Sequence, residues 1–390
     1  MFKWEFRKNS KYPIQLLIWS TAREIEKIII SVVLNFNGGL IYTPLMFIGE
    51  FLSGLIIYSY QLKYLKYKKA ERKRFFSIVL IEGKKEMITL DHKIIIYLLI
   101  FFAASFDFIQ FILSIYMSRF MFISGSLCSR LSGILLISAA LYYIYVLKFN
   151  ILRHQIFSLI VIGACLVIVI ITEFIFQEIN IFLPYGHFFL ALVIIVLTHF
   201  FNSLLDLIEK YLFEFNFFNP FKTLMFEGLF GFLLSCIYCI FNNPFEEIIL
   251  YQKEQTTNIF IIFCILLILY TFLSGAKNAF RIVTTHIYSP MTTTLMEYFC
   301  NPLYMIYDFI SDADFITGGK RNPAYFILNL ILGLVISIFS CVYNEFLILF
   351  CCNFEYYTYS QIAERALSVD KELVYVHHND HNDDDDEDEE

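Results

Sequence analysis

Nine long apolar runs cross this chain of 390 residues, and several of them carry one ionisable residue near the middle. The hydrocarbon core of a bilayer is about 30 Å thick, and a helix needs about 20 residues to cross it. Most of the runs reach that length, so the sequence predicts an all-α polytopic membrane protein. The runs are Ile41–Tyr60, Ile94–Tyr116, Met121–Val146, Ile156–Phe176, Phe188–Ile208, Leu224–Phe241, Ile259–Ser274, Tyr288–Ile310 and Tyr325–Phe350.

The composition excludes an ordinary soluble domain. Hydrophobic residues make up 58% of the chain, against about 45–50% in soluble proteins. Much of the net charge of −7 comes from His381–Glu390. We expect a cytoplasmic tail over residues 354–390 that is acidic and disordered from about residue 377, because such a segment has no core to bury. The basic N-terminus lacks the apolar region and cleavage site of a signal peptide.

The first apolar segment, Pro13–Leu34, is the weakest because it contains Arg23, Glu24, Glu26 and Lys27. A charge in mid-helix costs about 2.5–3.5 kcal/mol on an insertion scale. The segment is either a first membrane helix with its charges paired toward the bundle interior, or an amphipathic helix at the membrane surface. The sequence leaves both interpretations open.

Positive charges in the loops predict the orientation. The loop after the first clear run is rich in lysine and arginine from Lys63 to Lys85, which is typical of a cytoplasmic loop. Alternation then predicts further cytoplasmic turns and a cytoplasmic C-terminus. Those turns would hold the pairs Lys148 with Arg153, Lys210 with Lys222, and Lys277 with Arg281.

About ten helices in two inverted five-helix halves would follow if the first segment also crosses the membrane. The predicted halves are residues 1–179 and 180–353, divided at a polar turn near Asn180–Tyr185. Secondary transporters are often built from such inverted repeats, with the substrate site at the interface between them.

Four embedded ionisable residues are the first candidates for a substrate-binding or coupling site: Glu50, Asp107, Arg130 and Glu227. Gln110 lies one turn after Asp107. Such groups are expensive in lipid, so they should face inward and pair. Arg130 is the strongly basic residue well inside a clear run, and it needs an acid, carbonyl groups or an anionic ligand. One interpretation is a structural ion-pair network. The other is a polar cavity where Arg130 meets substrate and a carboxylate carries a coupling proton.

Small residues cluster near these charges and predict close helix contacts. They are Gly49, Gly54, Gly125, Ser129, Ser132, Gly133, Gly228 and Gly231. We expect no metal and no cofactor. Cys236 and Cys239 form a C-x-x-C spacing inside an apolar run, without a second pair. Enzyme motifs such as GxSxG and HExxH are absent from the sequence.

Several of the charged segments resemble one family of transporters. They are MFIGEF around Glu50, AASFDFIQFILSIYM around Asp107, SLCSRLSGILLISAALYYIY around Arg130, FNPFKTLMFEGLFGFLLS around Glu227, and SGAKNAFRIVTTHIYSPMTTTLMEYF, which contains Asn278. The chain resembles the drug/metabolite transporter superfamily, and within it the F branch of solute carrier family 35. The most specific segments are EGLFGF and SxxSRLSGI, and the likeness runs from about Pro13 to Asn353.

The resemblance implies ten helices in inverted halves, alternating access, and residence in a Golgi, endosomal or lysosomal membrane. It also brings Asn278 into the set of candidate site residues. Better-known relatives carry nucleotide sugars, but Thr293 and Cys300 stand here where their ninth helix looks cationic. Fewer fixed positive charges argue against a pyrophosphate-bearing substrate.

The leading hypothesis is therefore a secondary transporter of a small polar or anionic solute across an endomembrane. A membrane scaffold or receptor with the same fold is the main alternative, and an intramembrane enzyme is the weakest because no converging catalytic pair is recognised. The expected partners are a small-molecule solute and the lipid bilayer, with no nucleic acid. Formation of a homodimer is left open by the sequence.

Overall fold

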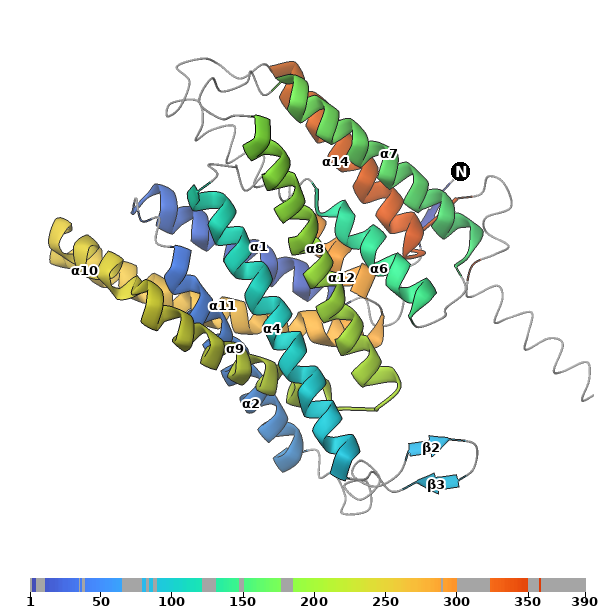
Figure 1. Ribbon diagram of the computed structural model, residues 1–390, viewed down its shortest axis with the longest axis horizontal. Coiled ribbons are helices and arrows are strands. Elements are labelled where there is room, and N and C mark those ends of the chain that lie inside the picture. The colour runs from blue at the N-terminus through green and yellow to red at the C-terminus, as the bar shows by residue number, and fades with distance from the viewer. Residues whose placement is uncertain are drawn as a thin grey trace, which may run out of the picture.

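The chain folds into a bundle of helices that run at varied angles to one another (Figure 1). The computed structural model describes residues 2–4, 11–34, 36, 39–64, 79–81, 84–86, 90–120, 131–146, 151–176, 185–288, 290–299, 323–349 and 358. The helices in these ranges are α1 Lys11–Val32, α2 Gly39–Tyr64, α4 Leu90–Phe120, α6 Gly133–Tyr145, α7 Arg153–Phe176, α8 Tyr185–Glu214, α9 Pro220–Asn242, α10 Pro244–Glu254, α11 Thr257–Ile287, α12 Pro290–Tyr298 and α14 Pro323–Tyr343.

Two short antiparallel strand pairs add to the helices. Strand β1 (Phe2–Trp4) pairs with β4 (Leu347–Leu349), so the N-terminal residues lie beside the segment that follows α14. Strand β2 (Val79–Ile81) pairs with β3 (Lys84–Glu86) within the basic loop. The expected last run, Tyr325–Phe350, is therefore a helix only to Tyr343 and then turns into a strand.

Among the described residues, six helices are long and apolar enough to cross a membrane: α2, α4, α7, α8, α9 and α11. Gly133–Tyr142 and Ile327–Tyr343 are shorter apolar helical stretches. These lengths fit an all-α, multi-pass membrane protein.

The distribution of side chains agrees with that reading, because apolar residues cover the outside and polar residues are buried. Ile268 and Phe272 of α11 are 71% and 63% exposed, whereas Thr284 and Thr285 of the same helix are fully buried. A soluble protein places its large apolar side chains inside. The reversed arrangement is expected where the surrounding medium is lipid.

Glycines bring three helices into close contact, as the sequence predicted. A Cβ atom on Gly275 of α11 would lie 2.4 Å from the carbonyl oxygen of Gly49 in α2. Cβ atoms on Gly228 of α9 and on Gly54 of α2 would lie 2.3 Å and 2.6 Å from backbone nitrogens of the facing helix. Helix α2 is thus wedged between α9 and α11, with backbones too close for any side chain at these glycines.

The helices pair in a pattern with two-fold regularity. The pattern appears when helices of the first part of the chain are matched in order with helices of the second part: α1 with α8, α2 with α9, α4 with α11, α6 with α12 and α7 with α14. Each main contact between two helices then has an equivalent contact between their matched helices. Helix α4 packs on α8 as α11 packs on α1, and α9 packs on α4 as α2 packs on α11. Helices α2 and α9 pack on each other, as do α7 and α14, which lie side by side in Figure 1 although they are far apart in the sequence.

Helix α1 directs its charges inward. Glu24 is buried, accepts from Arg23 at 2.5 Å and pairs with Lys27 at 3.4 Å, which confirms the expected pairing at i, i+3. The helix packs along α11, and on its other side Ile18 and Ile25 are 51% and 44% exposed. Helix α1 is nevertheless too polar to count among the six spanning candidates.

Candidate functional site

The first contact of the candidate site joins α2 to α11. The Gly49–Gly275 contact brings the two backbones together, and Glu50 and Asn278, which lie within one turn of these glycines, then meet. The side-chain amide of Asn278 donates a hydrogen bond to the Glu50 carboxyl group. Both side chains are buried, with 2% and 5% exposure. The glycine contact therefore sets the position of two of the predicted site residues.

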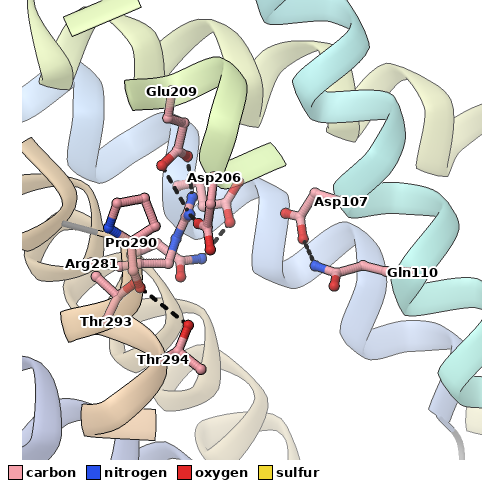
Figure 2. Close-up of polar contacts among 10 residues, drawn as sticks. Asp107, Gln110, Asp206, Glu209, Arg281, Pro290, Thr293 and Thr294 are labelled. Carbon is pink, nitrogen blue, oxygen red and sulfur yellow. Dashed lines mark hydrogen bonds and ion pairs between the residues drawn. The ribbon is translucent and has the colours of Figure 1, made fainter. Parts of the chain in front are cut away.

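Helix α4 contributes Asp107 and Gln110. They are one turn apart, and the Gln110 amide donates a hydrogen bond to the Asp107 carboxyl group (Figure 2). Both are partly exposed. The Asp107 carboxyl interacts electrostatically with Glu50 and with Arg281, so it faces the same interior region as the first contact.

Buried ion pairs link α11 to α8. One nitrogen of the Arg281 guanidinium, Nη2, donates to Glu209 Oε1 at 2.5 Å, and Nη1 donates to Glu209 Oε2 at 3.1 Å and to Asp206 Oδ1 at 3.3 Å. Asp206 and Glu209 are three residues apart and so share one face of α8. Figure 2 shows both acids directed at the guanidinium. All three side chains are buried, with Glu209 at 0% exposure.

Helix α9 contributes Glu227. It lies next to Gly228, whose close contact with α2 places this carboxyl group near the crossing of α2 and α9. Glu227 is 3% exposed, and its Oε1 atom has no hydrogen-bond partner among the described residues. Its carboxyl group interacts electrostatically with Glu209, Glu50 and Arg281. Buried polar atoms almost always have a partner, so this atom points to a ligand, a water molecule or a proton at this position.

Together these residues form the buried charge network. Its five acids are Glu50, Asp107, Asp206, Glu209 and Glu227, and its two cations are Lys277 and Arg281. Arg23 of α1 also acts on Asp107, but it is paired with Glu24 on its own helix and is not counted with the network. The acids come from α2, α4, α8 and α9, and both cations come from α11. Five helices therefore meet in one polar region. Such an arrangement can bind a charged solute or protons, and it couples these bound groups to the packing of the helices.

Lys210 fixes the end of α11 beside the network. Its ammonium group donates to the carbonyl oxygens of Thr285 and Tyr288, each at 3.2 Å, and pairs with Glu214 at 2.7 Å. These carbonyls belong to the last turn of α11, where a cation is favourable. Lys210 therefore attaches α8 to the helix that carries Arg281.

Figure 2 also draws two threonines at the start of α12. Thr293 Oγ1 donates to the carbonyl oxygen of Pro290 at 2.5 Å, and Thr294 Oγ1 donates to the same oxygen at 3.1 Å. Both hydroxyl hydrogens are therefore used within α12. Because threonine is uncharged, Thr293 contributes no positive charge.

One expectation about the cations was wrong. Lys210, Lys277 and Arg281 were predicted to lie in cytoplasmic turns, but they are buried within α8 and α11. The apolar run Ile259–Ser274 is only part of α11, which continues to Ile287. The physical reason is pairing: the acids of α8 make it possible for Arg281 to be buried inside a long helix. The signal available in the sequence was a pair of acids three residues apart in LLDLIEK and a pair of cations four residues apart in GAKNAFR, since each spacing places both charges on one face of a helix.

Arg130 lies outside the described residues. The predicted anchoring role of Arg130 therefore stays a prediction. The structure brings Glu50, Asp107, Gln110, Glu227 and Asn278 together, and adds Asp206, Glu209, Lys277 and Arg281, which the sequence reading missed.

Comparison with protein-family models and with curated proteins finds no match to this chain. The resemblance to a solute carrier family thus stays a prediction from the sequence segments.

Proposed function

We propose that this protein is a secondary transporter that moves a small polar solute across an endomembrane by alternating access. The observation that carries the proposal is the position of the buried charge network. It lies where α2 crosses α9, and these two helices are counterparts in the two-fold pairing pattern. Inverted-repeat transporters bind substrate at the interface between their halves.

The pairing of the helices supports two halves, α1–α7 and α8–α14. Contacts between counterpart helices, α2 with α9 and α7 with α14, are what an axis between the halves requires. In this proposal, α1 is the first membrane helix of the first half. Its inward charges and outward isoleucines are consistent with a helix between lipid and protein.

The charges support transport over a purely structural role. A static ion-pair network would be expected to balance its charges and to satisfy its hydrogen bonds. Here acids outnumber cations among the described residues, and Glu227 has an unpartnered oxygen. A site that exchanges its ligand during a cycle combines both features.

The proposal is tested by comparing the solutes that accumulate in membrane vesicles. Vesicles with the wild-type protein are compared, by untargeted mass spectrometry, with vesicles that contain Glu50→Gln or the control Glu254→Gln. Glu254 is an exposed acid at the end of α10. We expect at least one solute to accumulate with wild type and control, and at least about tenfold less with Glu50→Gln, because the substitution removes the negative charge of a buried acceptor.

Identical solute profiles in all vesicles, with folded protein present at equal amounts, would contradict transport. That outcome would favour the membrane scaffold or receptor. The endomembrane location is tested separately by fractionation of cells that express the full chain.

A further inference from the structure

We propose that the ligand of the buried charge network is a small organic cation. This inference rests on the proposed function for its location, and it replaces the anionic solute that Arg130 alone would suggest. It follows from the charges of the network, from one unpartnered atom and from the aromatic side chains around them.

The charge count is the first step. With every group ionised, five carboxylates against Lys277 and Arg281 leave an excess of three negative charges among the described residues. Counting Arg130 as a further cation would still leave an excess of two. Uncompensated charge in a region of low dielectric is unfavourable. A proton shared in the hydrogen bond between the Glu209 and Glu227 carboxyl groups would remove one of these charges. A cationic ligand would remove the remaining excess, whereas an anionic ligand would increase it.

The positions of the charges are the second step. Arg281 already contacts Glu209 and Asp206 through three hydrogen bonds, so its guanidinium is engaged by the protein. An anionic solute would have to displace these carboxylates. Glu50 and Asp107 do not hydrogen-bond to the Arg281 guanidinium. Among the described residues, the carboxyl group of each accepts a hydrogen bond from one side-chain amide. Amide donors leave the negative charge of a carboxylate in place.

Glu227 supplies an observation independent of the charge count. Its Oε1 atom is buried and without a hydrogen-bond partner among the described residues, and its carboxyl group interacts with Glu50, Asp107 and Glu209. An acceptor atom in this position lacks a donor. An ammonium group supplies both the donor and the positive charge.

The surroundings favour an organic cation over a bare ion. Met46, Phe47 and Tyr270 form a buried cluster with Phe108 and Phe111 packed against it. Phe47 lies one turn from Glu50, and Phe108 is next to Asp107. Aromatic faces attract cations and also bury apolar groups. A ligand with an ammonium group and a small hydrocarbon body would use the acids and the aromatic side chains together.

The test uses full-length protein purified in detergent. The probes are choline, tetramethylammonium and butylamine, each compared with its uncharged isostere and with a carboxylate of similar size. Binding is followed by equilibrium dialysis and by the shift in thermal unfolding. We expect at least one cation to bind, with dissociation constants at least about tenfold weaker in Glu227→Gln, because one charged hydrogen bond is removed. The control Glu254→Gln should bind as wild type does.

Three results would overturn the proposal: binding by the carboxylates but not by the cations, binding only by sodium, potassium or magnesium ions, or no binding by any cation. Equal affinity for cations in wild type and Glu227→Gln would also overturn it. Glu227→Asp, which keeps the charge, shows whether a loss of binding reflects misfolding, since a charge-dependent site should retain part of its affinity in that variant.

The outcome is separable from that of the proposed function. Cation binding without accumulation of any solute in vesicles would support this inference and contradict transport. Accumulation of an anionic solute would support transport and contradict the inference.

Discussion

At the scale of single residues, Arg281 links two helices through buried charged contacts. Its three hydrogen bonds connect α11 to Asp206 and Glu209 of α8, and the environment is almost fully buried. Removing one partner of a buried pair leaves the other charge uncompensated, which typically costs about 3–5 kcal/mol. The structural contribution of Arg281 is therefore testable apart from any transport assay.

We expect Arg281→Ala to lower the free energy of unfolding by about 3–5 kcal/mol, because two buried carboxylates lose their cation. Lys253 is exposed on α10, so Lys253→Ala should change stability by about 0.5 kcal/mol or less. The measurement is denaturant unfolding of the purified protein in mixed micelles. Equal stability of the two variants would show that the acids of α8 do not depend on this guanidinium.

At the same scale, a substitution of a contact glycine tests the close approach of α2 and α11 without removing any polar side chain. Gly275→Ala would place a Cβ atom 2.4 Å from the carbonyl oxygen of Gly49, whereas Gly333 of α14 has no neighbouring atom within 4 Å. We expect Gly275→Ala to lower the thermal unfolding temperature and also to weaken the Glu50–Asn278 contact. Gly333→Ala should be neutral or slightly stabilising, since alanine favours helix by about 1 kcal/mol over glycine. Equal effects of the two substitutions would contradict the close contact of α2 and α11.

At the scale of elements, the sequence predicts the helices well where hydropathy alone decides. The runs behind α2, α4, α7, α8 and α9 match helices of the structure within a few residues, and Glu50, Asp107 and Glu227 face the interior as expected. The end of α11 was not predictable in this way. Lys277 and Arg281 look like loop charges until Asp206 and Glu209 are placed beside them, and Glu209 is 72 residues away from Arg281 in the chain.

Helix α1 is the element whose environment the sequence left undecided. Ile18 of α1 and Ile249 of α10 are similarly exposed, at 51% and 50%. If α1 lies against lipid, Ile18→Lys should reduce the yield of folded protein in membranes strongly, because a lysine in mid-membrane costs about 2.5–3.5 kcal/mol. Ile249→Lys, on the more polar α10, should have little effect. Similar yields for both variants, measured by detergent extraction and gel filtration, would place α1 in contact with water.

At the scale of the whole molecule, the two-fold pattern matches the contact of α2 with α11 to the contact of α9 with α4. The two contacts are built differently in this structure. Helices α2 and α11 touch through glycines, and the Glu50 carboxyl group accepts from Asn278 between them. Their counterparts, α9 and α4, meet through larger rings, such as Phe101 and Phe230 with centroids 5.7 Å apart. An acid–amide contact like that of Glu50 with Asn278 would be available between α9 and α4 if Gln110 donated to Glu227. In this structure Gln110 instead donates to Asp107 on its own helix.

An alternating-access cycle would exchange these two arrangements, because inverted halves can swap conformations around a fixed site. We therefore expect a second state in which α4 and α9 approach, Gln110 donates to Glu227, and α2 separates from α11. Spin labels at Leu98 and Leu233 report on the first pair of helices, and labels at Ile56 and Ile268 on the second; all four side chains are exposed. The two distance distributions should shift in opposite directions when a bound solute changes the population of the two states.

Gln110→Leu should suppress the second state, because Glu227 would lose its donor. The first state depends on Asn278 and should be kept. Distances that shift together, or a second state that persists in Gln110→Leu, would rule out this exchange of partners.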